Sequence, residues 1–104
     1  MLIYKAYFLF NLASGKTVEE YEKWSIEVNH PAAGRVESIQ EFHDYKTVAT
    51  LDGSMPAYQI IEEILISDVE KYKKDITAPE MAGFSEEWGS WVSDWICILT
   101  ERVA

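Results

Sequence analysis

The stretch "AYQIIEEILIS", Ala57 to Ser67, decides the fold of this chain. It is a short apolar run that follows the turn sequence "LDGSMP" and precedes a helix-start signal formed by Ser67 and Glu70. An apolar run of this length between such signals is typical of a strand covered on both faces. The stretch therefore predicts a central strand of a sheet.

Two adjacent carboxylates, Glu62 and Glu63, lie in the middle of this strand. Neighbouring residues of a strand point to opposite faces, so at least one carboxylate should be shielded from water. A buried carboxylate needs a partner, for which Lys5 is a candidate, or it takes up a proton. Two interpretations stay open. One is a structural pair or a carboxylate at a wet dimer seam, and the other is an acid or base with a raised pKa in a pocket.

The chain before this strand contains a second apolar strand and a helix. Residues 2–12 are rich in aromatic and aliphatic side chains with little alternation, which predicts another central strand. Thr17 and Glu20 form a capping-box signal in front of an amphipathic helix over residues 18–29. Apolar side chains recur in it at helical spacing: Val18, Tyr21, Trp24 and Val28. A bend with proline and glycine should end this helix.

The rest of the chain supplies a polar strand, two helical segments and a last strand. Residues 36–49 are β-rich but polar, and residues 94–102 are expected to form the final strand. Between the second and last apolar strands, apolar side chains recur at helical spacing in two groups: Val69, Tyr72 and Ile76, then, after Pro79, Met81, Phe84, Trp88 and Val92.

The predicted order is β-α-β-β-α-β in a single domain over residues 1–104. Right-handed crossovers and a central hairpin make this an α+β, ferredoxin-like fold. We expect a four-stranded antiparallel sheet of strand order 4-1-3-2 with the helices on one face. The other face carries too many rings to lie in water, so a second copy should pack against it as a homodimeric α+β barrel.

Charge and composition narrow the classes of partner. Nine basic and eighteen acidic residues give a net charge of −9, which disfavours nucleic acid and anionic membrane surfaces. Cys97 is the single cysteine, and no Cys/His spacing suits a metal, so we expect neither a disulfide nor a metal site. The apolar opening is too short to span a bilayer and lacks a signal-peptide layout, so a cytoplasmic protein is expected.

The stretch "EFHDY", residues 41–45, places a carboxylate, an imidazole and a phenol alternately on one strand face. The following turn decides which residues lie opposite. A two-residue loop puts His43 opposite Glu62, and a four-residue loop puts Tyr45 there, whereas a three-residue loop would substitute Glu63 and Gln59. His43 is thus a candidate for proton transfer beside Tyr45 and Glu62. The alternative is a histidine on a solvated edge or at the dimer seam.

The stretch "VNHPAAGRVES", residues 28–38, places an amide, an imidazole and a guanidinium on one bend built with Pro31. A ligand that enters between helix and sheet would meet Asn29, His30 and Arg35 there. Arg35 could hold an anionic or carbonyl group, and His30 could exchange a proton. The alternative is a helix C-cap, in which Asn29 takes the left-handed conformation and the helix dipole favours His30.

The four tryptophans are expected mostly in the core. Trp24 lies somewhat more than one turn before His30, and Trp88 lies on the opposing helix, so a flat aromatic ligand could stack between them. The sequence contains no dinucleotide fingerprint, haem motif or nucleophile elbow, and we expect no cofactor.

Two stretches carry a resemblance to a known family. "YEKWSIEVNHPAAGRVESIQEFHDY", residues 21–45, looks like the small dimeric α+β-barrel superfamily, and "TAPEMAGFSEEWGSWV", residues 77–92, resembles its ethyl-tert-butyl-ether-degradation type. Within that group the chain is most similar to the RedY-like HapK family, found with prodiginine pigment pathways. The resemblance implies a homodimer with one pocket per subunit and a pyrrole, bipyrrole aldehyde or related planar substrate. Of the superfamily's functional positions, the loop histidine carries over, onto His30.

Two functional hypotheses follow. The first is a tailoring enzyme that promotes condensation, cyclisation or dehydration of a planar intermediate, with His30 and His43 as the titrating groups. Arg35 would then anchor the ligand, and Trp24 and Trp88 would form stacking walls. The second is a non-catalytic protein that shields or delivers a reactive intermediate. A cavity shared by His30 and a carboxylate would favour the enzyme, and a cavity of rings alone would favour binding.

Overall fold

The computed structural model describes residues 2–104 and has the predicted order of strands and helices. Each half of the chain forms one strand–helix–strand unit. The elements are β1 Tyr4–Leu12, α1 Val18–Trp24, a π-helical turn Ser25–Asn29, α2 His30–Gly34, β2 Ile39–Lys46, β3 Ile60–Ile66, α3 Val69–Ile76, a 3₁₀ turn Pro79–Met81, α4 Ala82–Trp91 and β4 Val92–Glu101.

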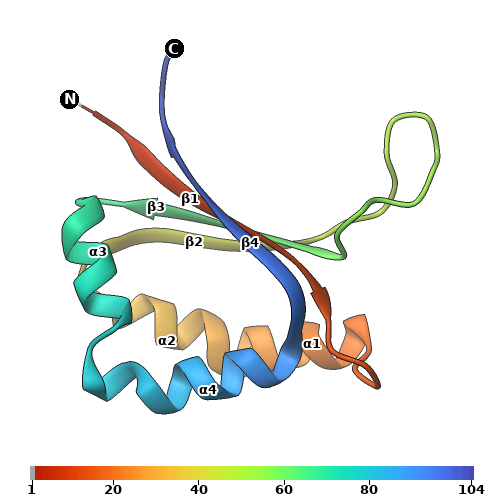
Figure 1. Cartoon of the computed structure of the whole chain (residues 1–104), viewed down its shortest axis with the longest axis horizontal. Coiled ribbons are helices and arrows are strands. Elements are labelled where there is room, and N and C mark those ends of the chain that lie inside the picture. Colours follow the sequence, from red (N-terminus) through yellow and green to blue (C-terminus); the bar gives the residue numbers. More distant parts are fainter. Residues whose placement is uncertain (1) are drawn as a thin grey trace.

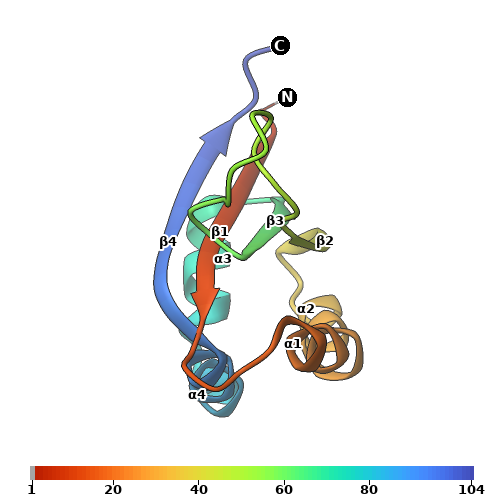
Figure 2. The ribbon, with the colours of Figure 1, turned by 90° about the vertical axis from the view of Figure 1, so that its right-hand side faces the viewer.

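The four strands form one antiparallel sheet in the order β2-β3-β1-β4, which confirms the predicted topology. The apolar strands β1 and β3 are central, and β2 and β4 are the edges. All helices lie on one side of the sheet, as the two perpendicular views show (Figure 1, Figure 2). Within residues 2–104, no helix has the length and hydropathy needed to cross a membrane.

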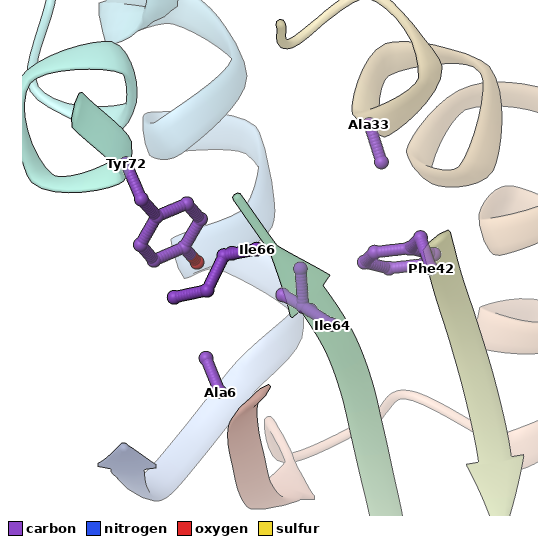
Figure 3. Close-up of a cluster of buried hydrophobic side chains, with 6 residues drawn as sticks. All are labelled: Ala6, Ala33, Phe42, Ile64, Ile66 and Tyr72. Atoms are coloured by element: carbon purple, nitrogen blue, oxygen red, sulfur yellow. The ribbon is translucent and has the colours of Figure 1, made fainter. Parts of the chain in front are cut away.

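The core between sheet and helices consists of two clusters. The first joins the sheet to α2 and α3 and is drawn in Figure 3: Ala6, Ala33, Phe42, Ile64, Ile66 and Tyr72. The second joins the other end of the sheet to α1: Phe10, Leu12, Tyr21, Trp24 and Ile60. Five of these eleven side chains are aromatic, and each ring buries a large area.

The first helical segment differs from its prediction. We expected it to end at Asn29, but it continues through a π-helical turn into α2 and ends near Gly34. The backbone N–H of His30 donates to Ser25 O, five residues back, which widens the turn. Pro31 then stands in the first turn of α2, where a missing N–H costs little. A proline that usually stops a helix is therefore tolerated inside this one.

Helix α3 begins one residue later than the sequence signal indicated. The cap is Asp68, whose side chain accepts a hydrogen bond from the backbone N–H of Lys71 at 2.9 Å. The predicted pair of Ser67 and Glu70 does not form the cap. Asp68 wins because a carboxylate at the cap position accepts from the N3 amide and is also favoured by the helix dipole.

The connection from β2 to β3 is a long arm rather than a short hairpin loop. Residues 47–59, named here the β2–β3 arm, project beyond the sheet on the side away from the helices (Figure 1). Its base is closed by a hydrogen bond from Thr47 N to Gln59 O at 2.9 Å. The resulting register places His43 opposite Glu63 and Asp44 opposite Glu62. This is the register that a three-residue loop predicts.

Candidate functional site

A cavity of about 430 Å³ lies between the sheet and the helices. Sheet residues form its floor, and α2, α3 and α4 form its walls. Figure 3 shows part of this lining, with Phe42 and Ile64 on the strands facing Ala33 and Tyr72 on the helices. The other lining residues are mostly apolar and aromatic: Phe8, Val36, Ile39, Ile76, Met81, Phe84, Trp88 and Trp95. This composition is typical of a small-molecule pocket.

Glu62 is the one acidic side chain among the described residues that line the cavity, and it is 3% exposed. Its carboxyl group accepts hydrogen bonds from Asn29 Nδ2 at 3.0 Å and from Trp88 Nε1 at 3.3 Å. The pKa of Glu62 is raised to about 8, mainly by burial and also by the nearby carboxylate of Asp44, against the lowering effect of the two donors. Glu62 therefore holds a proton at neutral pH.

Asp44 lies directly opposite Glu62 on the neighbouring strand. Its Oδ2 atom accepts hydrogen bonds from Tyr21 OH at 2.7 Å, from Ser25 Oγ at 2.5 Å and from Asn29 Nδ2 at 3.3 Å. Burial raises the pKa of Asp44 above its usual value, and these donors limit the rise. With three donors against the two on Glu62, Asp44 is the member of the pair that carries the negative charge.

The π-helical turn brings Asn29 between the two carboxyl groups. Asn29 is 2% exposed, and its amide donates to both Asp44 and Glu62. A π-helical turn rotates the residues that follow it relative to a regular helix, and such turns are frequent at functional sites. Asn29 is thus held in the cavity wall by its two acidic partners rather than capping a helix end.

Three of the predicted ligand-binding residues line the cavity: Asn29, Glu62 and Trp88. Trp24 does not. It is buried behind the wall, where its ring stacks on Phe84 and its Nε1 donates to Glu87 at 2.7 Å. The predicted stacking of a ligand between Trp24 and Trp88 is therefore wrong, because the ring of Trp24 is already covered by α4.

His30 and Arg35 do not border the cavity, contrary to the prediction. Both are exposed, because the helix continues past Asn29 and turns their side chains outward. His30 Nε2 lies 3.0 Å from the backbone oxygen of Phe42, and its ring meets the Phe42 ring edge-on. His30 therefore links α2 to β2.

His43 and Tyr45 lie on the opposite face of the sheet from Glu62. The register pairs His43 with Glu63 and Tyr45 with Ile61, so both side chains point away from the helices. The His43 side chain is 51% exposed, and its Nε2 atom lies 3.9 Å from Glu41 Oε1. The expected cluster of His43, Tyr45 and Glu62 does not form, because residues of opposite strand parity cannot share a face.

Glu62 and Glu63 point to opposite faces of the sheet, as expected for adjacent residues of a strand. Glu62 is buried, and Glu63 pairs on the other face with Lys5 at 3.6 Å and with Tyr7 OH at 3.1 Å. The prediction that one of these carboxylates is buried and paired is confirmed, with Glu62 hydrogen-bonded to Asn29 and Trp88. Lys5, the candidate partner, is found beside Glu63.

Sequence reasoning missed Asp44, Tyr21 and Ser25. Asp44 stands inside "EFHDY", and the three-residue loop alternative would have turned it toward Glu62. Tyr21 belongs to the apolar stripe of α1, which predicts a ring in the core and does not indicate that its hydroxyl donates to Asp44. No signal in the sequence indicated that Ser25 would face Asp44, because the π-helical turn that directs it has no evident motif.

The arrangement supports proton transfer in a largely apolar cavity. A protonated carboxyl group in such a place can donate to a carbonyl or imine, and its conjugate base can take a proton from an acidic C–H or N–H. Burial and, second, the negative charge of Asp44 keep the proton on Glu62 at neutral pH. The pair resembles other sites in which two neighbouring carboxyl groups share one proton.

The profile of the family described as "REDY-like protein HapK" matches residues 4–103. No curated protein sequence matches the chain significantly. HapK from Hahella chejuensis has a similar structure, with a TM-score of 0.79 and 15% identity over 97% of this chain and 93% of that one.

Other solved structures share the fold. A DABB family protein with a ferredoxin-like fold from Mesorhizobium loti has a TM-score of 0.75 and 11% identity, and each chain is covered completely, 100% and 100%. A dimeric ferredoxin-like protein of unknown function from Thermobifida fusca has a TM-score of 0.69 and 10% identity over 97% of this chain and 92% of that one. At these identities the structures establish the fold, and the sequence profile establishes the family. The chain belongs to the REDY-like HapK family.

Proposed function

We propose that this protein binds a planar heteroaromatic metabolite in the helix–sheet cavity and that Glu62 transfers a proton to or from it. The proposed setting is the biosynthesis of a prodiginine-type pigment or a related secondary metabolite. The observation that carries the proposal is a buried carboxyl group, with a pKa raised to about 8, facing an aromatic cavity. Membership in the REDY-like HapK family supports the biosynthetic setting.

The cavity suits a flat, mostly apolar ligand with a few polar atoms. Phe8, Phe42 and Trp88 offer ring surfaces, and a volume of about 430 Å³ lies within the range of small-molecule sites. A pyrrole or bipyrrole aldehyde has this chemistry. Its carbonyl oxygen could accept from protonated Glu62, and Ser85 and Thr77 supply hydroxyl groups elsewhere in the lining.

The proposed step is acid–base catalysis of a condensation. As a carbon or nitrogen nucleophile attacks the aldehyde carbon, the C=O π electrons move to oxygen, and Glu62 donates its proton to that oxygen. The nucleophile loses its own proton to the resulting carboxylate, so Glu62 returns to its starting state. Loss of water from the hydroxyl adduct would then complete a conjugated product. Glu62 replaces His30 and His43 as the titrating group in this scheme.

We also propose that the protein works as a homodimer through the uncovered sheet face. This face carries partly exposed apolar side chains from three strands: Leu9 of β1, Ile61 and Leu65 of β3, and Ile96 and Ile98 of β4. Structural relatives described as dimeric support the proposal. Sedimentation at micromolar concentration should return twice the 12.0 kDa chain mass, and a stable monomer would contradict it.

The direct test compares Glu62→Gln with Glu63→Gln, which changes the neighbouring carboxylate on the opposite sheet face. Bipyrrole aldehyde would be titrated against tryptophan fluorescence, and its condensation with a monopyrrole nucleophile would be followed by mass spectrometry. Glu62→Gln should abolish turnover, and Glu63→Gln should leave it unchanged. Equal turnover in both variants would contradict a role for Glu62.

The same experiment separates the enzyme from a carrier. The largely apolar lining also suits a protein that shields a reactive intermediate. If wild-type protein binds the aldehyde tightly and slows its decay without forming product, the carrier function replaces the catalytic one. If neither wild type nor either variant binds the aldehyde, the catalytic function and the carrier function are both contradicted.

A further inference from the structure

Large apolar side chains that face solvent are concentrated in two parts of the molecule. One part is the β2–β3 arm, where Val48, Leu51 and Met55 are 89% or more exposed. The other is the edge strand β4, whose exposed residues project from both of its faces: Trp95, Ile96, Ile98 and Leu99. Several large apolar side chains exposed close together in the chain are typical of an interaction site.

The arm is held in one shape by its own hydrogen bonds. Thr50 N donates to Ser54 O at 3.0 Å, Gly53 N donates to Thr50 O at 3.0 Å, and Ser54 N donates to Asp52 Oδ1 at 3.0 Å. Hydrogen bonds from Ser54 and Thr50 lower the pKa of the Asp52 carboxyl to about 2, so it stays ionised and accepts them. Gly53 has φ +86°, which suits glycine in a tight turn. The polar groups of the tip thus bond to one another, and Leu51 and Met55 point outward.

Strand β4 is an apolar edge. It pairs with β1 on one side, and within residues 2–104 no strand pairs with its other side. An exposed edge with apolar side chains on both faces is a template for pairing with another chain. Asp94 has φ +41° at a bulge opposite the Phe10–Asn11 step, so the strand is bent near Trp95.

The sheet register puts the start of the arm level with this exposed part of β4. Lys46, at the end of β2, pairs with Ile60 on β3. Ile60 pairs with Phe10 on β1, and Phe10 pairs with Trp95 on β4. The arm and Trp95 therefore lie at the same level along the strands but at opposite edges of the sheet.

We propose that the arm of one copy lies along the edge of β4 in a second copy. In this dimer the two sheets stack face to face and are related by a two-fold axis parallel to the strands. This axis places β2 of the partner on the same side as β4 of the first chain. Because β2 and β4 of one chain run antiparallel, the partner's β2 and this β4 also run antiparallel. The partner's arm then begins level with Trp95. The contact occurs twice and is self-complementary, as a two-fold interface requires.

The contact would make the arm a border of the partner's cavity. Trp95 lines the cavity from β4 and is 52% exposed on its own. An apolar arm residue against Trp95 would cover the cavity wall from outside. The proposal rests on the homodimer proposed above and is independent of the chemistry assigned to Glu62.

Photo-crosslinking tests the contact directly. A chain with Leu51→p-benzoylphenylalanine at natural isotope abundance is mixed with ¹⁵N-labelled wild-type chain, irradiated and digested. The expected product joins the light arm to a heavy peptide containing residues 92–99. Crosslinks within one chain, crosslinks to another part of the heavy chain, or none from a dimeric sample would overturn the proposal.

Substitution provides a second measurement. Leu51→Ser combined with Met55→Ser should weaken dimerisation at least about tenfold in sedimentation, as loss of buried apolar anchors does. Ile26→Ser is the matched control, because Ile26 is 68% exposed on the helix side of the sheet and should leave dimerisation unchanged. Circular dichroism confirms folding of each variant. Equal dimerisation of the arm variant and wild type would overturn the arm contact alone, whereas a monomeric wild type would overturn the homodimer and leave the cavity proposal standing.

Discussion

Asp44 of β2 lies directly opposite Glu62 of β3, and the Asn29 amide donates a hydrogen bond to each of them. Burying two carboxyl groups side by side is costly unless one of them keeps its proton. Tyr21 and Ser25 add donors to Asp44, so the charge settles there and the proton stays on Glu62. The pair leaves a protonated acid facing an apolar cavity, and its properties can be tested separately from any substrate.

Asp44→Asn should lower the pKa of Glu62. The asparagine removes the neighbouring negative charge that raises this pKa, although burial of Glu62 remains. The carboxyl carbon of Glu62, labelled with ¹³C and followed by NMR against pH, should titrate at least about one unit lower than in wild type. Glu41→Gln changes an exposed acid on the same strand and should leave the titration in place. An unchanged midpoint in Asp44→Asn would show that burial alone raises the Glu62 pKa.

The free energy of unfolding should fall as the pH rises from about 4.5 to about 8. In this window the folded protein keeps the Glu62 proton, whereas the unfolded chain releases it, so the folded state binds more protons. The contribution is fully present below about pH 4.5 and is lost above about pH 8. Urea unfolding at a series of pH values should show a loss on the order of a few kcal/mol. Glu62→Gln should flatten this dependence, and an equally steep curve in the variant would contradict the assignment.

Gly89→Leu should block ligand binding without unfolding the protein. Gly89 lines the cavity, and a Cβ built on it meets no atom within 4 Å, so a leucine there can occupy space that the ligand needs. Replacing glycine in a helix also stabilises it by roughly 0.5–1 kcal/mol. Gly83→Leu is the matched control on α4, because Gly83 also has open space at its Cβ and does not line the cavity. Both variants should melt at or above the wild-type temperature, and only Gly89→Leu should lose the fluorescence response to bipyrrole aldehyde. Equal binding by both would place the ligand elsewhere.

His30→Ala should cost stability and leave ligand binding intact. The variant loses the contact between the His30 ring nitrogen and Phe42 O at 3.0 Å and the packing against the Phe42 ring, together about 1–2 kcal/mol. His43→Ala, on the exposed sheet face, serves as the comparison and should change the stability of the monomer by less than about 0.5 kcal/mol. Thermal unfolding and fluorescence titration measure the two effects. Weakened binding by His30→Ala at unchanged stability would restore His30 as a ligand-binding residue.

The positions of Glu62 and His43 show how far sequence reasoning reached toward the site. The apolar run from Ala57 to Ser67 required a central strand, and the alternation of side chains required the two acids to diverge. The length of the connection between β2 and β3 decides which residues of β2 face Glu62. With the β2–β3 arm as the connection, the register turns Asp44 toward the helices and His43 away from them. The strand sequences alone do not reveal the register of β2 against β3. A shift of one residue in this register moves every side chain of the strand to the other face.

By itself, the sequence determined the order of the elements, the two apolar central strands, the ferredoxin-like topology and a buried carboxylate within "IIEEI". These follow from local periodicity and from the rules that connect strands and helices. The tertiary structure alone decided that Asn29 would turn into the cavity, that His30 would stay outside it, and that Asp44 would meet Glu62. The positions of Asn29 and His30 depend on the wider helical turn at Ser25–Asn29, and the pairing of Asp44 with Glu62 depends on the register beside the arm. Packing between segments that are distant in the sequence determines both features. Neither has a local sequence signal.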